Sequence, residues 1–209
     1  MAQRSGSATT AAYGVQALAG PPRARQHGRM SESLVALMRR LTLGVYVIGV
    51  CDGARPNAFT ACSVMPVSFD PVLLALAMGH DHASLPMLRA SGHFTVNVLG
   101  QGQLQLAQHF GASSGREQDK LAGTRWSASA AGAPLLAEAL ACLTCEVRSS
   151  MRAGDHELFV ARVTRGVIRA HDATPLTYAD TGDMDGSARL YGERTLPGAL
   201  ASHEQAHQR

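Results

Sequence analysis

Apolar positions follow a helical spacing near residue 34 and strand-like patterns over most of the remaining chain. Leu34, Leu37, Met38 and Leu41 recur at i, i+3, i+4 and i+7, which predicts a helix capped by Ser31 or Ser33. Residues 45–51 are β-branched and aromatic and are followed by Asp52-Gly53, so they predict a strand that ends in a hairpin turn. Residues 71–78 form a continuous apolar run, which predicts a strand buried on both faces.

The rest of the chain predicts short elements separated by polar segments. Extended chain or strands are expected at 57–68, 94–99, 141–148, 157–169 and 175–178, and short helices at 83–91 and 103–110. Residues 111–133 are polar and rich in Gly and Ser, which indicates a long excursion. Many short strands with turn signals and few helices predict a mainly β protein, an antiparallel barrel with helical caps.

The composition is that of a chain with one soluble globular domain. The chain has 209 residues, of which 45% are hydrophobic and 17% charged, as is usual for a globular protein. Residues 1–29 contain no acid and no apolar signal segment, so we interpret them as a disordered extension. An organelle transit peptide, or a start at Met30, is an alternative. The expected domain covers 30–196, and 197–209 form a flexible tail.

Charge and cysteine content exclude several classes of protein. A formal net charge of +3 without a basic stripe argues against nucleic-acid binding. The longest apolar run is far shorter than a membrane span. The four cysteines in a chain of this length, without a secretory signal, do not indicate a disulfide framework. We therefore expect a cytoplasmic protein with no nucleic-acid or membrane partner.

Two motifs that could carry chemistry fail on their context. Gly100-Gln101-Gly102 follows a predicted strand, but Gln105 occupies the third glycine position of a dinucleotide fingerprint, so a simple turn is the better interpretation. Cys142 and Cys145 lie three apart on a predicted strand and should face opposite sides, which favours a structural pair over a zinc or redox site.

A third motif, His80-Asp81-His82, places two imidazoles on one face if the segment is extended. No third ligand with suitable spacing is evident, so the sequence predicts no metal site.

Five segments in register resemble the flavin reductase family. Residues 58–71, AFTACSVMPVSFDP, are similar to the family's A-x-T-A-x-S-x-x-x-V-S-x-D-P stretch, and SGHFTVNVL at 91–99 is similar to its S-G-x-F-x-V-N-V-L strand. QHF at 108–110, GDH at 154–156 and PLTY at 175–178 match the family's later segments. Their order and spacing agree over roughly residues 34–180.

The resemblance implies an antiparallel Greek-key split β-barrel of the FMN-binding type, which forms a homodimer with the flavin near the interface. Carried over residue by residue, it places flavin-binding groups at Thr60, Ala61, Cys62, Ser63, Ser68, Ser84, Arg89, Asn97 and Phe110. Hydroxyls and a guanidinium suit a flavin phosphate. Backbone donors near Thr60 would stabilise the negative charge of the reduced ring.

The same resemblance places His156 beside the nicotinamide, where a hydrogen bond to the carboxamide would hold the hydride over flavin N5. The implied function is an NAD(P)H-dependent flavin reductase that uses FMN or FAD, with NADH or NADPH as the hydride donor. The reductase component of a two-component monooxygenase is one form of it. The alternatives are a non-catalytic FMN-binding electron-transfer flavoprotein and a barrel that binds no flavin.

Overall fold

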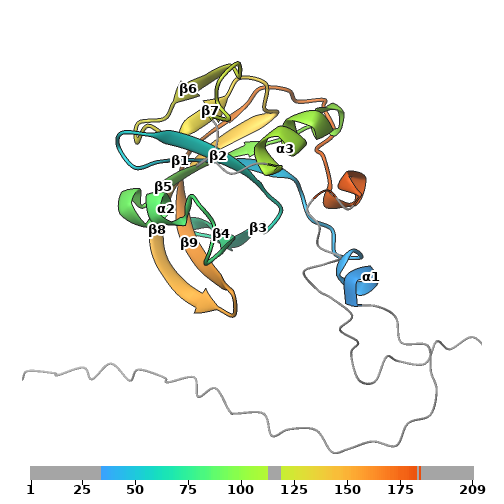
Figure 1. Cartoon of the computed structure of the whole chain (residues 1–209), viewed down its shortest axis with the longest axis horizontal. Helices are drawn as coiled ribbons and strands as arrows, with labels where there is room; N and C mark the ends of the chain where they lie inside the picture. The colour runs from blue at the N-terminus through green and yellow to red at the C-terminus, as the bar shows by residue number, and fades with distance from the viewer. Residues whose placement is uncertain (1–33, 113–118, 183, 185–209) are drawn as a thin grey trace, which may run out of the picture. The chain divides into compact units, whose positions relative to one another are not determined.

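A seven-stranded antiparallel sheet forms most of the fold (Figure 1). The computed structural model describes residues 34–112, 119–182 and 184, so the predicted N-terminal extension and C-terminal tail lie outside the described residues. The strands are β1 (Tyr46–Cys51), β2 (Pro56–Ala61), β3 (Val64–Phe69), β4 (Val72–Gly79), β5 (His93–Val98), β8 (Ala141–Ala153) and β9 (His156–Ile168). Their order in the sheet is β2-β1-β5-β8-β9-β4-β3.

Short elements complete the structure around this sheet. They are α1 (Leu34–Met38), α2 (Leu85–Ser91) and α3 (Leu104–Gly111), the 3-10 turns η1 (Gln101–Gln103) and η2 (Tyr178–Thr181), and a small sheet of β6 (Trp126–Ala128) and β7 (Pro134–Leu136). No helix within the described residues is long and apolar enough to cross a membrane. The structure is thus mainly antiparallel β with a few short helices, as predicted.

The two edge strands of the sheet follow each other directly in sequence. β2 ends at Ala61 and β3 begins at Val64, although they occupy opposite ends of the strand order. Cys62 and Ser63 alone connect them, and two residues span only about 7 Å when extended. The sheet must therefore curl until its two edges are nearly in contact, which is the geometry of a barrel.

The two faces of the sheet carry separate hydrophobic cores. On one face Ile48 and Val50 of β1 pack in a cluster closed by Leu85 and Leu88 of α2. On the other face Val47 of β1 packs in a second cluster with Ala107 and Phe110 of α3 and Leu136 of β7. Because successive residues of a strand point to opposite faces, one apolar strand supplies both cores.

Asn97 links strands, core and the β6–β7 sheet through one buried amide. Its side chain is 0% exposed. Nδ2 donates to the carbonyls of Val47 (2.9 Å) and Pro134 (3.2 Å), and Oδ1 accepts from the backbone N–H of Leu136 (2.8 Å). The amide satisfies backbone groups that would otherwise be buried without partners.

Several predicted elements differ from the structure for identifiable reasons. Residues 57–68 form two strands rather than one extended segment, because the link at 62–63 contains neither Gly nor Pro to signal a break. β8 extends beyond the predicted strand to Ala153, because its last residues are exposed and partly charged and carry no alternating apolar pattern, whereas β9 agrees with the predicted 157–169 to within one residue at each end. Residues 175–178 are not a strand but make isolated bridges to Gly100 and Gly44.

Three other predictions are only partly right. The helix at residue 34 ends at Met38, and Leu41 is exposed rather than on a packed face. The excursion at 111–133 contains β6. The run at 71–78 is fully buried only over Leu74–Leu76 and at Met78, because its first residues, Val72 above all, lie on a hairpin outside the core.

Replacing Asn97 by Ala should lower the free energy of unfolding by roughly 3 kcal/mol, because the buried N–H of Leu136 and the carbonyls of Val47 and Pro134 lose the amide as their hydrogen-bond partner. Urea denaturation followed by the fluorescence of Trp126, the single tryptophan, measures this. Gln108→Ala, at an exposed position of α3, is the control and should cost less than about 0.5 kcal/mol. Equal stability of the two variants would contradict the buried role.

Candidate active site

The link between β2 and β3 is an accessible stretch of backbone and polar side chains. The N–H of Val64 donates to the carbonyl of Cys62, and that of Ala77 on β4 donates to the carbonyl of Ser63, both at 3.0 Å. Ser63 is exposed, and Thr60, Ala61 and Cys62 are partly exposed. The structure therefore brings these four predicted residues together at the curled edge of the sheet.

Thr60 connects this link to the end of α3. Its hydroxyl donates to the carbonyl of Ala107 at 2.6 Å. Gly111, the last residue of α3, faces the same side chain, and a Cβ there would lie 3.5 Å from the Cβ of Thr60. Because the hydroxyl proton is engaged with the helix, Thr60 can offer a ligand its backbone and the acceptor side of its oxygen.

His156 begins β9, directly opposite Gly79 of β4. Its Nδ1 lies 2.7 Å from Oδ1 of Asp155, and its side chain is 46% exposed. The hydrogen bond from His156 holds the pKa of Asp155 below its usual range. A carboxylate partner assigns the proton to Nδ1, which leaves Nε2 as the hydrogen-bond acceptor of the neutral ring.

A glycine keeps the space beside this imidazole open. A Cβ on Gly79 would lie 3.2 Å from Oδ1 of Asp81 and 4.0 Å from Nε2 of His156. Any larger side chain would therefore fill the space beside the Nε2 atom.

The β2–β3 link and His156 lie on one face of the sheet, one strand apart. Ser63 sits beside Ala77, and His156 pairs with Gly79, two residues further along the same strand. With strands about 4.8 Å apart and a rise of about 3.3 Å per residue, their Cα atoms are about 12 Å apart. Paired residues share a face, so Ala77 and Gly79 form a floor without bulky side chains between them.

Arg89 of α2 is held by a carboxylate of β9, on the sheet face opposite to His156. Its Nε donates to Oε2 of Glu157 at 2.8 Å, and its Nη2 pairs with the same oxygen. Ser150 donates to Oε1 of Glu157 at 2.7 Å. These bonds, that of Arg89 first, hold the pKa of Glu157 below its usual range. The Arg89 side chain is half exposed.

Three predicted flavin contacts are closed inside the protein. Ser84 is 1% exposed, and its Oγ accepts from Nδ2 of Asn57 at 2.9 Å. Asn97 and Phe110 are both 0% exposed, and Phe110 packs in the core beneath α3. A buried serine, amide or aromatic ring of a family motif can pack beneath the site without touching the ligand. The role of these three residues at the flavin stays a prediction, and in the described structure their side chains are buried.

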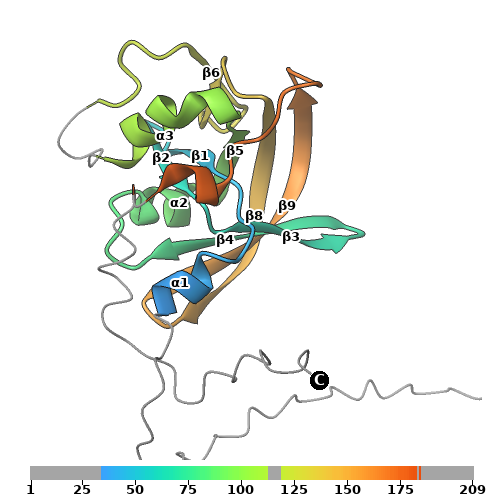
Figure 2. The same cartoon turned by 90° about the vertical axis from the view of Figure 1, so that its right-hand side faces the viewer.

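Ser68 stands apart from the other predicted residues. It follows a bulge of β3, on the hairpin that extends past β8 and β9 (Figure 2). Five residues of strand separate it from Ser63, which corresponds to roughly 16 Å. Within one chain it does not join the group at the β2–β3 link.

The cysteine pair Cys142 and Cys145 and the His80-Asp81-His82 motif, for which the sequence favours no metal or redox site, lie in or beside the hydrophobic cores. Cys142 and Cys145 are buried in different core clusters, and burial raises the pKa of the Cys145 thiol to about 12. The ring of His82 packs 4.3 Å from that of Phe59, and its Nδ1 accepts the N–H of Ser84. Among the described residues, no three His, Cys, Asp or Glu side chains gather in a way that could hold a metal ion.

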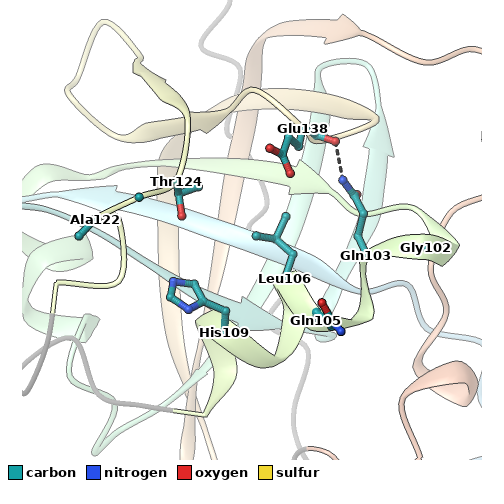
Figure 3. A pocket seen from close by; sticks show the side chains of 9 residues that line it. Gly102, Gln103, Gln105, Leu106, His109, Ala122, Thr124 and Glu138 are labelled. Atoms are coloured by element: carbon teal, nitrogen blue, oxygen red, sulfur yellow. Dashed lines mark hydrogen bonds between the residues drawn. The ribbon is translucent and has the colours of Figure 1, made fainter.

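A separate hollow of about 440 Å³ lies on α3 (Figure 3). The sequence did not predict it, because its lining comes from three distant segments. Gln105 and His109 lie on the face of α3 opposite Ala107 and Gly111, which contact Thr60. The hollow is therefore distinct from the β2–β3 link. Its lining residues are Gly102, Gln103, Gln105, Leu106, His109, Ala122, Gly123, Thr124 and Glu138.

A family model described as "Flavin reductase like domain" matches residues 38–187. Among curated proteins, the high molecular weight rubredoxin of Moorella thermoacetica is 33% identical over 144 residues, which is 68% of this chain. The chain spans 62% of the length of that protein.

Two solved structures share the fold. An NADH:FAD oxidoreductase of Streptomyces globisporus is 30% identical with a TM-score of 0.65, covering 70% of this chain and 89% of that one. Nitrilotriacetate monooxygenase component B of Mycobacterium thermoresistibile is 28% identical with a TM-score of 0.64, covering 69% and 80%. The predicted split-barrel fold is confirmed by these likenesses.

Glu157→Gln should lower the free energy of unfolding by about 1 kcal/mol at pH 7, because it removes the charge that pairs with the half-exposed Arg89. A carboxyl with a lowered folded-state pKa stabilises the fold above its unfolded pKa of about 4.3, and this stabilisation is lost as pH falls through the folded value. The difference between wild type and variant should therefore shrink as pH falls below about 4.

Chemical denaturation at a series of pH values measures this difference. Glu146→Gln, which breaks a more exposed pair with Arg148, is the control and should have little effect. A difference that stays constant from pH 7 to pH 3 would contradict a role for the Glu157 charge.

Proposed function

Because this chain belongs to the flavin reductase-like domain family, we propose that it is an NAD(P)H:flavin oxidoreductase that transfers a hydride to FMN or FAD. The observation that supports this most directly is the shared sheet face. The β2–β3 link and His156 lie one strand apart on it, with only Ala77 and Gly79 between them. Two stacked planar rings need such a floor, with polar groups at its borders.

The residues present fit a flavin at the link and a nicotinamide near His156. The missing side chain at Gly79 leaves room beside Nε2 of His156. Exposed backbone at residues 61–63 provides hydrogen-bonding groups for a ring edge, and Ser63 adds a hydroxyl. The flavin supplies the hydride-accepting chemistry, so the protein must mainly position the two ligands and exclude alternative geometries.

The hydrogen bond between Asp155 and His156 gives the imidazole a defined chemical role. With its proton on Nδ1, the ring presents Nε2 as an acceptor. The carboxamide N–H of a nicotinamide is a suitable donor to that atom. His156 would thus orient the nicotinamide without exchanging a proton, and Asp155 would hold the tautomer.

Relatives support the reductase and suggest its acceptors. The Streptomyces structure is described as an NADH:FAD oxidoreductase, and the Mycobacterium structure as a monooxygenase component. On that basis the reduced flavin of this protein would serve a monooxygenase. The buried free cysteines among the described residues suit a reducing compartment such as the cytoplasm.

A second candidate is a flavoprotein that holds FMN and exchanges electrons with a protein partner. It is favoured by the relative in Moorella thermoacetica, where a segment similar to this chain is part of a longer protein named for rubredoxin. Steady-state kinetics with FMN or FAD and with NADH or NADPH separates the two. Loss of the nicotinamide absorbance upon mixing supports the reductase, whereas a yellow protein that retains FMN through desalting without oxidising NADH supports the second candidate.

We also propose that the protein is a homodimer. Phe69 of the β3–β4 hairpin is 94% exposed, and Met65, Val67 and Val72 of the same hairpin are about half exposed. Monomers rarely expose such patches. Met65 pairs with Ala75, next to the Ala77 floor, so a second copy that packs on the Met65 side of this hairpin would cover the proposed site and enclose the ligands.

His156→Ala should raise the KM for NADH about tenfold, which corresponds to about 1.4 kcal/mol, because one hydrogen bond to the carboxamide is lost. The Kd for FMN should change less than about twofold. Initial rates and fluorescence titration measure the two constants. His171→Ala, at an exposed position outside the site, is the control. Loss of FMN binding with an unchanged KM would show that His156 contacts the flavin instead.

Phe69→Glu should weaken the dimer at least tenfold, because it places a charge in the centre of the apolar patch. Sedimentation velocity over a range of concentrations measures the association. Ile168→Glu changes a comparably apolar residue that is 58% exposed at the end of β9 and should leave the dimer intact. A dimer unaffected by Phe69→Glu would place the interface elsewhere.

A further inference from the structure

We propose that Lys120 is a positioning residue for the flavin site, acting through the C-terminal end of α3 and Thr60. This inference rests on the flavin site proposed above. Lys120 is the single lysine of the sequence, and it is 3% exposed. Charged side chains are seldom buried to this degree unless a specific partner holds them.

The partner of the ammonium group is a carbonyl in the last turn of α3. Nζ of Lys120 donates to the carbonyl of Phe110 at 2.9 Å. The last carbonyls of a helix have no partner within the helix and carry the negative end of its dipole, so a cation there is favourable. Burial also lowers the pKa of Lys120, which shows that desolvation opposes the charge and that the carbonyl must compensate.

A second hydrogen bond joins α3 to the segment that contains Lys120, with the roles of side chain and backbone exchanged. Nε2 of His109 lies 2.7 Å from the carbonyl of Lys120. A side chain of α3 thus holds the backbone of Lys120, while the side chain of Lys120 holds the backbone of α3. The final turn of the helix is therefore held by two hydrogen bonds to the same residue. His109 also lines the hollow shown in Figure 3.

This turn is the part of α3 that supports the candidate flavin site. The hydroxyl of Thr60 donates to the carbonyl of Ala107, and Gly111 packs against the same side chain. The N–H of Ala112 completes the turn by donating to the carbonyl of Gln108. A shift of the last turn would therefore move Thr60 and the backbone that follows it, whereas His156 is positioned by its hydrogen bond to Asp155 and its pairing with Gly79 of β4.

The test compares Lys120→Met and Lys120→Arg with wild type. Met fills the buried volume without charge or donor, so it should raise the Kd for FMN about tenfold. Arg keeps the charge and the donors and should restore binding to within about threefold of wild type. The KM for NADH at saturating flavin should change less than about twofold in both, because the nicotinamide side is untouched.

Ile48→Val, in the core cluster on the other face of the sheet, controls for a general loss of stability. It should leave the Kd for FMN unchanged. Hydrogen exchange of the flavin-free proteins provides a readout independent of ligand. The amide of Ala112 should exchange at least tenfold faster in Lys120→Met and not in Ile48→Val.

The outcomes separate this inference from the proposed function. If Lys120→Met binds FMN with the same affinity as the wild-type protein, the positioning role is overturned and the proposed function is not. Equal weakening by Ile48→Val also overturns it, because stability would then explain the effect. A wild-type chain that binds neither FMN nor FAD overturns the proposed function, and the positioning role with it.

Discussion

The two-residue connection between β2 and β3 constrains the rest of the structure. Cys62 and Ser63 join strands that stand at opposite ends of the sheet order, so the sheet can form only as a curled surface. Curling brings the exposed backbone of the link beside β4, and through β4 to His156 on β9. The candidate site is thus a consequence of how the sheet edges meet, and the surrounding helices close the cores on either side.

The same curl explains why the protein needs two hydrophobic cores in a short chain. β1 is apolar at nearly every position because one set of its side chains packs toward α2 and the other toward α3. Asn97 of β5 is a buried polar residue, and its amide supplies hydrogen-bond partners to backbone groups of β1 and of the β6–β7 segment. Rigid packing on both faces gives the site a fixed floor, which a reaction between two bound rings requires.

Local patterns were informative where function depends on adjacent residues. The segment Thr60–Ser63 and the Gly154-Asp155-His156 turn each keep their chemistry within a few positions, and the structure places both on one accessible face. Arg89 was identified as a cation near the site, but its partner Glu157 lies 68 positions away, and no local pattern reveals that pairing. Local patterns also do not predict the burial of Ser84, Asn97 and Phe110, because that burial depends on which elements cover these residues.

Apolar periodicity and short motifs are properties of neighbouring positions, so the sequence predicts most element types, the mainly β fold and a set of candidate site residues. The division of 57–68 between two sheet edges, the burial of several of those candidates and the burial of Lys120 at the end of α3 follow only from the folded structure. These are contacts between segments far apart in the chain. Their energies depend on burial and geometry, which exist only after folding.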